Sequence, residues 1–239
     1  ATTPKGPNAY FVSNRSKPEA TDSPLVFNDT VFLLELTNTM KSGNAQLKTY
    51  VGKSNIPYIT PPHALQSEGF RFETNDGHVL GALIDAGNIP FVGTGFDTTT
   101  GHTAVYHGVI TNVRNGTLDC QASIISADYD IGYPNLAYTG ISSGEDEYII
   151  GFNHSDTNLN AGQSAVFYSK GDYSDIIQTV PGFSHVSSGF GGTDVRWGDY
   201  YGIQRDYSDP GRVYVAGYKG IGNGQHTVGI AHLRSPHYI

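Results

Sequence analysis

The chain has 239 residues, of which only 15% are charged, and it is rich in glycine (30), tyrosine (16) and phenylalanine (11). This composition excludes a coiled coil and a disordered tail, and it favours an all-β, turn-rich protein large enough to bury a substantial core. The net charge of −8 argues against nucleic acid as a partner, because no excess of basic residues is present to release counterions. No apolar run approaches the roughly eighteen residues of a membrane-spanning helix, so we predict no membrane insertion.

Strand-like segments separated by turns of Gly, Asn, Asp and Ser follow one another along the chain. In chain order, we expect strands at 11–16, 30–36, 46–51, 69–74, 79–84, 102–109, 118–125, 135–140, 148–152, 163–168, 175–180, 197–205, 213–218 and 226–233. No segment combines a 3.6-residue apolar period with helix caps, which predicts essentially no α-helix. The single cysteine, Cys120, lies in an alternating strand and is interpreted as a packing residue.

The expected strands repeat as a unit of about seventy residues. Gly81, Gly151 and Gly217 hold the same place in the apolar strands of three units. Four antiparallel strands repeated radially form a blade of a β-propeller, and apolar strands without alternation indicate burial on both faces. We therefore predict an all-β propeller of four-stranded antiparallel blades, with a β-sandwich or a β-helix as the alternative. The units of this single domain are approximately 1–62, 63–130, 131–193 and 194–239.

The repeats leave the ring incomplete. The first unit begins at a second strand of a blade and the last unit ends after a third strand. An open propeller would expose blade faces and strand edges to solvent. We therefore expect the chain to be the C-terminal portion of a larger propeller, or to be joined by another chain that supplies the remaining blades.

One run near the C-terminus resembles known proteins. The segment Arg196-Trp197-Gly198-Asp199-Tyr200-Tyr201-Gly202, with the turn at 206–211 and the strand at 213–218, resembles the last blade of a group of secreted bacterial β-propeller proteins near the sialidase-like propellers. Tyr201 stands where that pattern usually has Ser or Thr. The resemblance implies a propeller fold and an extracellular or cell-surface location. It implies little about activity, because most members of the group are uncharacterised.

The same run has a structural and a functional interpretation. In the structural one, Trp197 is a large apolar wedge between blades, and Gly198 lets the backbone pass closely. In the functional one, side chains of the run face a ligand at the mouth of the propeller channel. The candidate ligand-binding residues are Arg196, Asp199, Tyr200 and Tyr201.

A carbohydrate-active hydrolase is the alternative function. A glycosidase needs two carboxylates roughly 5–10 Å apart, and the candidates near the expected axis are Glu68, Glu73, Asp76 and Asp199. Acidic residues beside Asn and Gly are more often turn formers. The Asp-box turns of sialidases are also missing from the sequence. We therefore favour a protein without enzymatic activity and assign no catalytic residue.

We predict no cofactor and no metal ligand. The nine histidines lack the close spacing of a ligand pair on one element, and we interpret them as solvated or channel-side residues. The runs Asp128-Tyr129-Asp130 and Glu145-Asp146-Glu147 offer oxygen ligands that are compatible with calcium. They form no calcium-loop signature, so calcium is not predicted.

Several positions match acceptor patterns for glycosylation. Sequons for N-glycosylation begin at Asn14, Asn28, Asn115 and Asn153. Thr30 and Thr98 follow an aspartate in a pattern that resembles an O-glycosylation acceptor of one group of bacteria.

These observations favour a non-enzymatic, extracellular or cell-surface propeller that binds glycan or protein through loops rich in Tyr, Asn and Asp. Tyrosine suits this role because its rigid ring gives a large contact area at low entropic cost. The hydrolase and a structural subunit of a surface assembly remain the alternatives.

Overall fold

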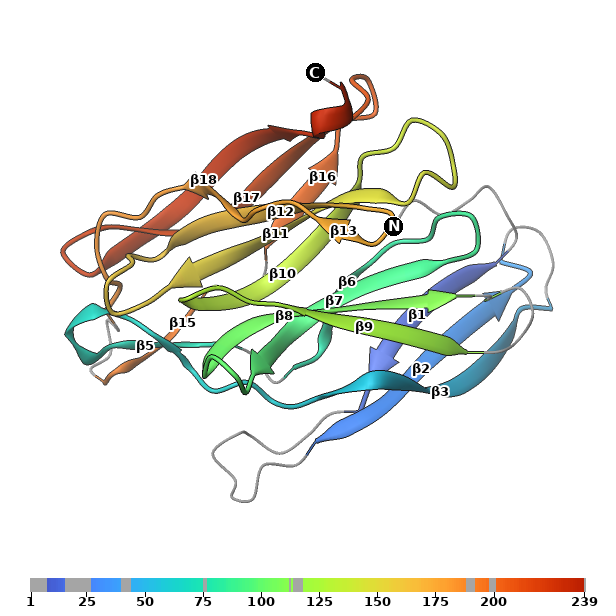
Figure 1. Cartoon of the computed structure of the whole chain (residues 1–239), viewed down its shortest axis with the longest axis horizontal. Helices are drawn as coiled ribbons and strands as arrows, with labels where there is room; N and C mark the ends of the chain where they lie inside the picture. The colour runs from blue at the N-terminus through green and yellow to red at the C-terminus, as the bar shows by residue number, and fades with distance from the viewer. Residues whose placement is uncertain are drawn as a thin grey trace.

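The computed structural model describes residues 8–15, 27–39, 44–74, 77–111, 113, 118–187, 192–197 and 201–238. Over these ranges the chain is all β, as predicted, with short 3-10 turns and no α-helix. Figure 1 shows the strands gathered into sheets that lie one beside the other along the molecule. The described part contains no helix that is long and apolar enough to cross a membrane.

The first half of the chain forms a seven-stranded sheet. Its strands, in spatial order, are β1 (Ala9–Asn14), β2 (Asn28–Thr37), β3 (Gln46–Tyr58), β9 (Asp119–Ile125), β8 (His102–Thr111), β7 (Ile89–Asp97) and β6 (Val79–Ala82). Strands β3 and β9 meet through a single parallel bridge, Ser54 to Cys120. The two outermost strands approach each other through Asn14, whose amide donates to the carbonyl of Gly77 at 2.6 Å and accepts from the N–H of Val79 at 3.2 Å.

A second antiparallel sheet lies at the centre of the molecule. It consists of β10 (Asp130–Tyr138), β11 (Glu147–Ser155), β12 (Gly162–Ser169), β13 (Asp172–Tyr173) and β14 (Ile177–Val180). All nine residues of β11 are buried, so the prediction of burial on both faces is confirmed for this strand. On one face Ile150 and Phe152 join a core with Val92 and Val105 of the first sheet, and Ile149 on the other face joins a core with residues of β17.

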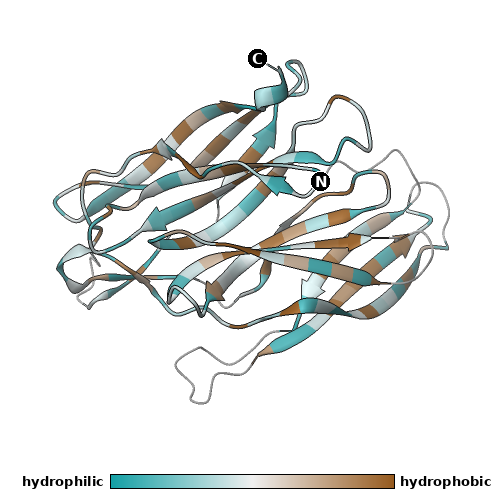
Figure 2. Cartoon of the chain, in the orientation of Figure 1, coloured by the Kyte–Doolittle hydropathy of each residue, from teal (hydrophilic) through white to brown (hydrophobic). Residues whose placement is uncertain are grey.

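Two three-stranded sheets complete the described fold. The C-terminal sheet consists of β16 (Gly202–Arg205), β17 (Arg212–Gly222) and β18 (Gln225–Arg234), and β17 packs on β11 and β12. The other sheet consists of β15 (Asp194–Arg196), β5 (Arg71–Glu73) and β4 (Ala64–Leu65), with β15 parallel to β5. Apolar bands run along the strands of each large sheet (Figure 2), as expected for sheets that bury a face.

The second repeat differs from the prediction. The segment expected as its buried second strand, 79–84, contains β6, which is an outermost strand, and the buried strand is β7. The reason is a tight turn between Asp85 and Asn88, where Ala86 and Gly87 both have positive φ. Gly81 therefore does not occupy the strand position of Gly151 and Gly217.

The long strand expected at 197–205 is also different. The structure has β15 before it and β16 at its end, and Trp197 and Tyr201 lie outside both strands. The reason is that both large rings turn into the apolar core: Trp197 is 0% exposed and Tyr201 is 2% exposed.

Candidate ligand-binding groove

The structure separates the predicted ligand-binding residues. Arg196 is exposed at the end of β15, beside Glu73 of β5. Tyr201 is fully buried in the core between the central and C-terminal sheets. A ligand cannot reach this side chain in the folded protein, so its assignment to ligand binding is corrected to a packing role. Gly198, Asp199 and Tyr200 lie outside the described residues.

Trp197 and the glycines of the repeat surround this core. The Trp197 ring stacks on Phe72 with ring centroids 4.7 Å apart, and a Cβ added at Gly132 would lie 2.7 Å from the Trp197 ring. Gly151 and Gly217 lie directly against the Tyr201 ring. Gly81 lies instead against the amide of Asn135, which donates to the carbonyl of Tyr201 at 3.0 Å.

The predicted glycosylation sites differ in exposure. Asn153 is 0% exposed, and its amide oxygen accepts from the N–H of Tyr218 at 3.1 Å, so a glycan at this position is incompatible with the folded protein. Asn14 and Asn28 are half-buried and hydrogen-bonded to the backbone. Thr30 is half-buried, Thr98 is exposed in a turn, and Asn115 lies outside the described residues.

Two of the four acids considered for hydrolysis lie in the described part of the chain. Glu68 is exposed in the turn Ser67–Gly69, with a positive φ of 61°. Glu73 lies on β5, and Asp76 and Asp199 lie outside the described residues.

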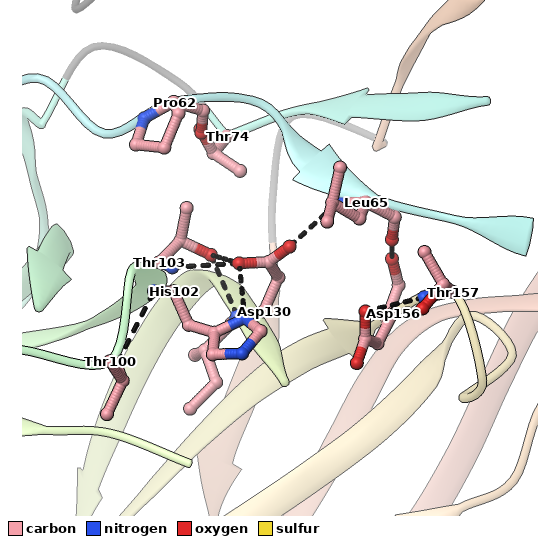
Figure 3. Close-up of polar contacts among 11 residues, drawn as sticks. Pro62, Leu65, Thr74, Thr100, His102, Thr103, Asp130, Asp156 and Thr157 are labelled. Carbon is pink, nitrogen blue, oxygen red and sulfur yellow. Dashed lines mark hydrogen bonds and ion pairs between the residues drawn. The ribbon is translucent and has the colours of Figure 1, made fainter. Parts of the chain in front are cut away.

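Asp130, from the acidic run 128–130, is a buried structural carboxylate. It accepts from the N–H of Leu65 at 2.7 Å and from the N–H of Thr103 at 2.8 Å. The His102 ring and the Thr103 hydroxyl lie 3.3 Å from the same carboxylate. Figure 3 shows these groups converging on Asp130 from two other segments of the chain. The carboxylate therefore fixes β10 to β4 and β8. Within the described part of the chain, no cluster of acidic, His or Cys side chains is arranged to hold a metal ion.

Two histidines are buried, which contradicts their interpretation as solvated or channel-side residues. His107 on β8 is 2% exposed and His154 on β11 is 0% exposed. Burial lowers the pKa of His107 from 6.5 to about 3 and that of His154 to about 4. Both rings are therefore neutral at pH 7.

These two histidines lie behind a surface groove of about 530 Å³. The groove runs between the connection that leads from β9 to β10 and the connection that leads from β13 to β14. Its volume is in the range of small-molecule sites, roughly 300–1,000 Å³. The polar and aromatic side chains along it are Ser126, Asp128, Tyr129, Tyr173, Ser174 and Asp175.

Tyr173 is held in the groove by His107. Nδ1 of His107 lies 2.6 Å from the Tyr173 hydroxyl, and Nε2 lies 2.8 Å from the hydroxyl of buried Tyr148. A neutral imidazole has one N–H donor and one acceptor, so one phenol donates to the ring and the other accepts from it. Both nitrogens are thus satisfied, and the orientation of Tyr173 is fixed from inside the protein.

Tyr129 is supported in a similar way by His154. The two rings meet edge to face, with centroids 5.6 Å apart. Nδ1 of His154 lies 2.7 Å from the Ser164 hydroxyl, and Nε2 lies 3.2 Å from the side-chain amide of Gln178. Each groove tyrosine is therefore backed by a buried neutral histidine whose own orientation is set by hydrogen bonds.

The groove combines aromatic surface with negative charge. Asp128 and Asp175 are exposed on its two walls, and none of the described residues that line it is basic. Two half-buried tyrosines offer flat apolar faces, and the carboxylates accept hydrogen bonds from hydroxyl or amine groups. This arrangement disfavours anionic ligands and suits a neutral polyhydroxylated molecule.

The sequence pattern alone does not predict this groove. The Tyr- and Asp-containing segments 128–130 and 172–175 are visible in the chain, but they come together only because β13 and β14 return along β12. The histidines sit in strands where alternation predicts neither their burial nor their tyrosine partners.

Comparisons with known proteins give no family. No protein-family model matches the chain, and a search of the curated proteins finds no match. Among solved structures, the chain is similar to an α-L-arabinofuranosidase, Arb93A from Fusarium graminearum, in complex with an iminosugar inhibitor, with 13% identity over 86% of this chain and 72% of that chain and a TM-score of 0.33. A mutant of that enzyme has 9% identity, coverages of 86% and 89%, and a TM-score of 0.28. At these identities and TM-scores the similarity transfers no activity.

Proposed function

We propose that the protein is a non-enzymatic, extracellular or cell-surface module that binds neutral glycans in the groove between Tyr129 and Tyr173. The observation that carries the proposal is the pair of tyrosines, each held from behind by a buried histidine, with an exposed aspartate on each wall.

The groove fits the chemistry of a sugar ring. A pyranose or furanose presents C–H groups on its faces, which pack on tyrosine rings, and hydroxyls on its edge, which donate to carboxylates. Because the tyrosines are already oriented, little side-chain entropy is lost when the ligand binds. Because the described residues along the groove include no basic side chain, we expect neutral sugars to bind in preference to uronic or sulfated ones.

The test is binding of a panel of neutral and uronic-acid-containing oligosaccharides, measured by isothermal titration calorimetry. We expect binding of a neutral member. Asp175→Asn should weaken it about tenfold or more, since a hydrogen bond to a charged group contributes about 1.5–3 kcal/mol. Tyr129→Ala should weaken it about tenfold or more because the variant loses the ring on which the sugar packs. Asp172→Asn and Tyr207→Ala change exposed residues outside the groove and serve as matched controls. Binding that survives every groove variant would refute the site.

The same samples test the hydrolase alternative. The groove carries two carboxylates, which is the minimum set for glycoside hydrolysis. If the wild type releases reducing sugar, and if Asp128→Asn and Asp175→Asn each abolish this release, the groove is a hydrolytic site and the binding proposal is wrong. Under the binding proposal, no sugar is released by the wild-type chain.

We further propose that the sheets are blades of a propeller. Support comes from edge strands of successive sheets, because β6 contacts β10 and β10 contacts β16. The blades of a propeller are separate sheets, so the bridge between β3 and β9 differs from a regular propeller. A solution scattering profile that fits flat stacked layers better than wedges around an axis would contradict this arrangement.

A further inference from the structure

The phenol groups of the two groove tyrosines are bonded inside the protein. Tyr129 is hydrogen-bonded to the hydroxyl of Ser164, which is buried behind it. The Tyr173 hydroxyl lies 2.6 Å from Nδ1 of the buried His107. It is also hydrogen-bonded to the Ser123 hydroxyl. Both tyrosines therefore turn their polar ends toward the interior, and it is their rings that line the groove.

The two serines of the groove are engaged as well. Ser174 accepts from the N–H of Phe167 at 3.0 Å and donates to the carbonyl of Asp175 at 2.9 Å. The Ser126 hydroxyl is hydrogen-bonded to the carboxylate of Asp97, which does not line the groove. A hydroxyl has a single proton to donate, so both serines have already committed theirs to the protein.

The two aspartates of the groove differ from these hydroxyls. Asp128 and Asp175 are exposed on its walls, and within the described part of the chain neither carboxylate forms an ion pair or a side-chain hydrogen bond. An ionised carboxylate only accepts hydrogen bonds. Among the described side chains that line it, the groove therefore offers a ligand two anionic acceptors, while its hydroxyls are already bonded within the protein.

This set of groups complements a protonated amine better than it complements a hydroxyl. An ammonium group has three donors and no acceptor, and a hydrogen bond between charged partners is roughly twice as strong as a neutral one. A cation is also attracted to the face of a tyrosine ring. The excess of acidic residues, 22 against 14 basic ones, adds an attraction that acts over a longer range.

We propose that the preferred ligands of the groove are glycans that carry a free amino group. The ammonium group pairs with the carboxylates of Asp128 and Asp175, and the sugar ring packs on the tyrosines. This inference rests on the proposed glycan groove and extends its ligands from neutral sugars to amino sugars. A neutral sugar binds through its ring and hydroxyls, but more weakly. An N-acetylated amine has no charge and a single donor, so it loses the advantage.

The test compares sugars that differ at one position. The methyl glycosides of glucose, galactose and mannose are each compared with the derivatives in which an amine or an acetamide replaces the hydroxyl on the second carbon. Dissociation constants are measured at pH 7, where an amino group is mostly protonated, from the amide resonances of the groove residues. We expect an amino derivative to bind about five- to tenfold more tightly than its neutral parent at low salt.

Variants and salt show whether the amine is recognised by the groove. Asp128→Asn and Asp175→Asn should each reduce the preference for the amine to about threefold or less. Asp172→Asn removes an exposed carboxylate outside the groove and should keep the preference of the wild type. Added salt should lower the preference, since it screens exposed charges. Tyr129→Ala should weaken the binding of the neutral and the amino forms alike, because both pack on the ring.

The amine inference and the glycan groove fail in different ways. If amino and neutral forms bind with equal affinity in every series, or if an acetylated form binds most tightly, the amine inference is wrong and the groove is unaffected. The same holds if Asp172→Asn lowers the preference as much as the groove variants do. If no sugar of any series shifts the resonances of the groove, both proposals are wrong.

Discussion

The two buried histidines predict a steep loss of stability between pH 7 and pH 5. In the unfolded chain both titrate near the ordinary pKa of 6.5, whereas burial lowers the pKa in the folded protein to about 3 for His107 and about 4 for His154. The unfolded chain therefore binds protons first as the pH falls. The stabilisation is complete above pH 6.5 and is lost progressively below it, until the folded pKa is reached.

The magnitude follows from linkage. One pH unit between the two pKa values corresponds to about 1.4 kcal/mol, so each histidine costs about 2 kcal/mol at pH 5 relative to neutral pH. Together they remove about 4 kcal/mol, which is a large share of the roughly 5–15 kcal/mol that stabilises a typical domain.

The assay is urea unfolding at pH 7, 6 and 5, followed by the fluorescence of Trp197, the single tryptophan. We expect His107→Gln and His154→Gln each to remove about half of the pH-dependent loss, whatever they do to absolute stability at pH 7. Thr98→Ala changes an exposed side chain that does not titrate and should leave the pH dependence as it is in the wild type. The reasoning would be refuted if the wild type had equal free energies of unfolding at pH 7 and pH 5. It would also be refuted if both buried-site variants lost as much stability between these pH values as the wild type does.

Three further predictions concern single side chains. Trp197→Ala removes a fully buried ring that stacks on Phe72 and should lower the free energy of unfolding by about 3–5 kcal/mol in urea, followed by circular dichroism because the variant lacks a tryptophan; a cost below 1 kcal/mol would contradict the packing role. Asp130→Asn replaces one of two accepting oxygens of a buried carboxylate and should cost about 2 kcal/mol, whereas Asp128→Asn, at an exposed site, should change stability by less than about 0.5 kcal/mol. Burial raises the pKa of the Cys120 thiol to about 11, so a thiol reagent at pH 8 should label it only after denaturant is added, and rapid labelling of the native chain would show that the strand opens.

Most of the strands could be predicted from the sequence, because period-two and continuous apolar runs directly reflect which faces are buried. The prediction for the second repeat was wrong because of one turn. Asp85 to Asn88 reverses the chain, but the preceding apolar run at 79–84 looked like the buried strand, and no strand was expected over 89–97, where β7 lies. The groove was beyond sequence reasoning for a different reason. Its tyrosines depend on histidines from β8 and β11, and no local pattern records that contact.

The single bridge between Ser54 and Cys120 has a consequence for how the protein opens. Elsewhere along this seam, side chains replace the backbone ladder: Asn55 accepts from the N–H of Ala122 at 2.6 Å, and the Tyr106 hydroxyl donates toward Ser54 and the carbonyl of Ile56. Strands β1 to β3 are therefore joined to β6–β9 by side chains, both these polar ones and the apolar core that includes Val31 and Leu33, with little continuous backbone pairing. In amide exchange these three strands should release their protons together, at a lower free energy than the central sheet.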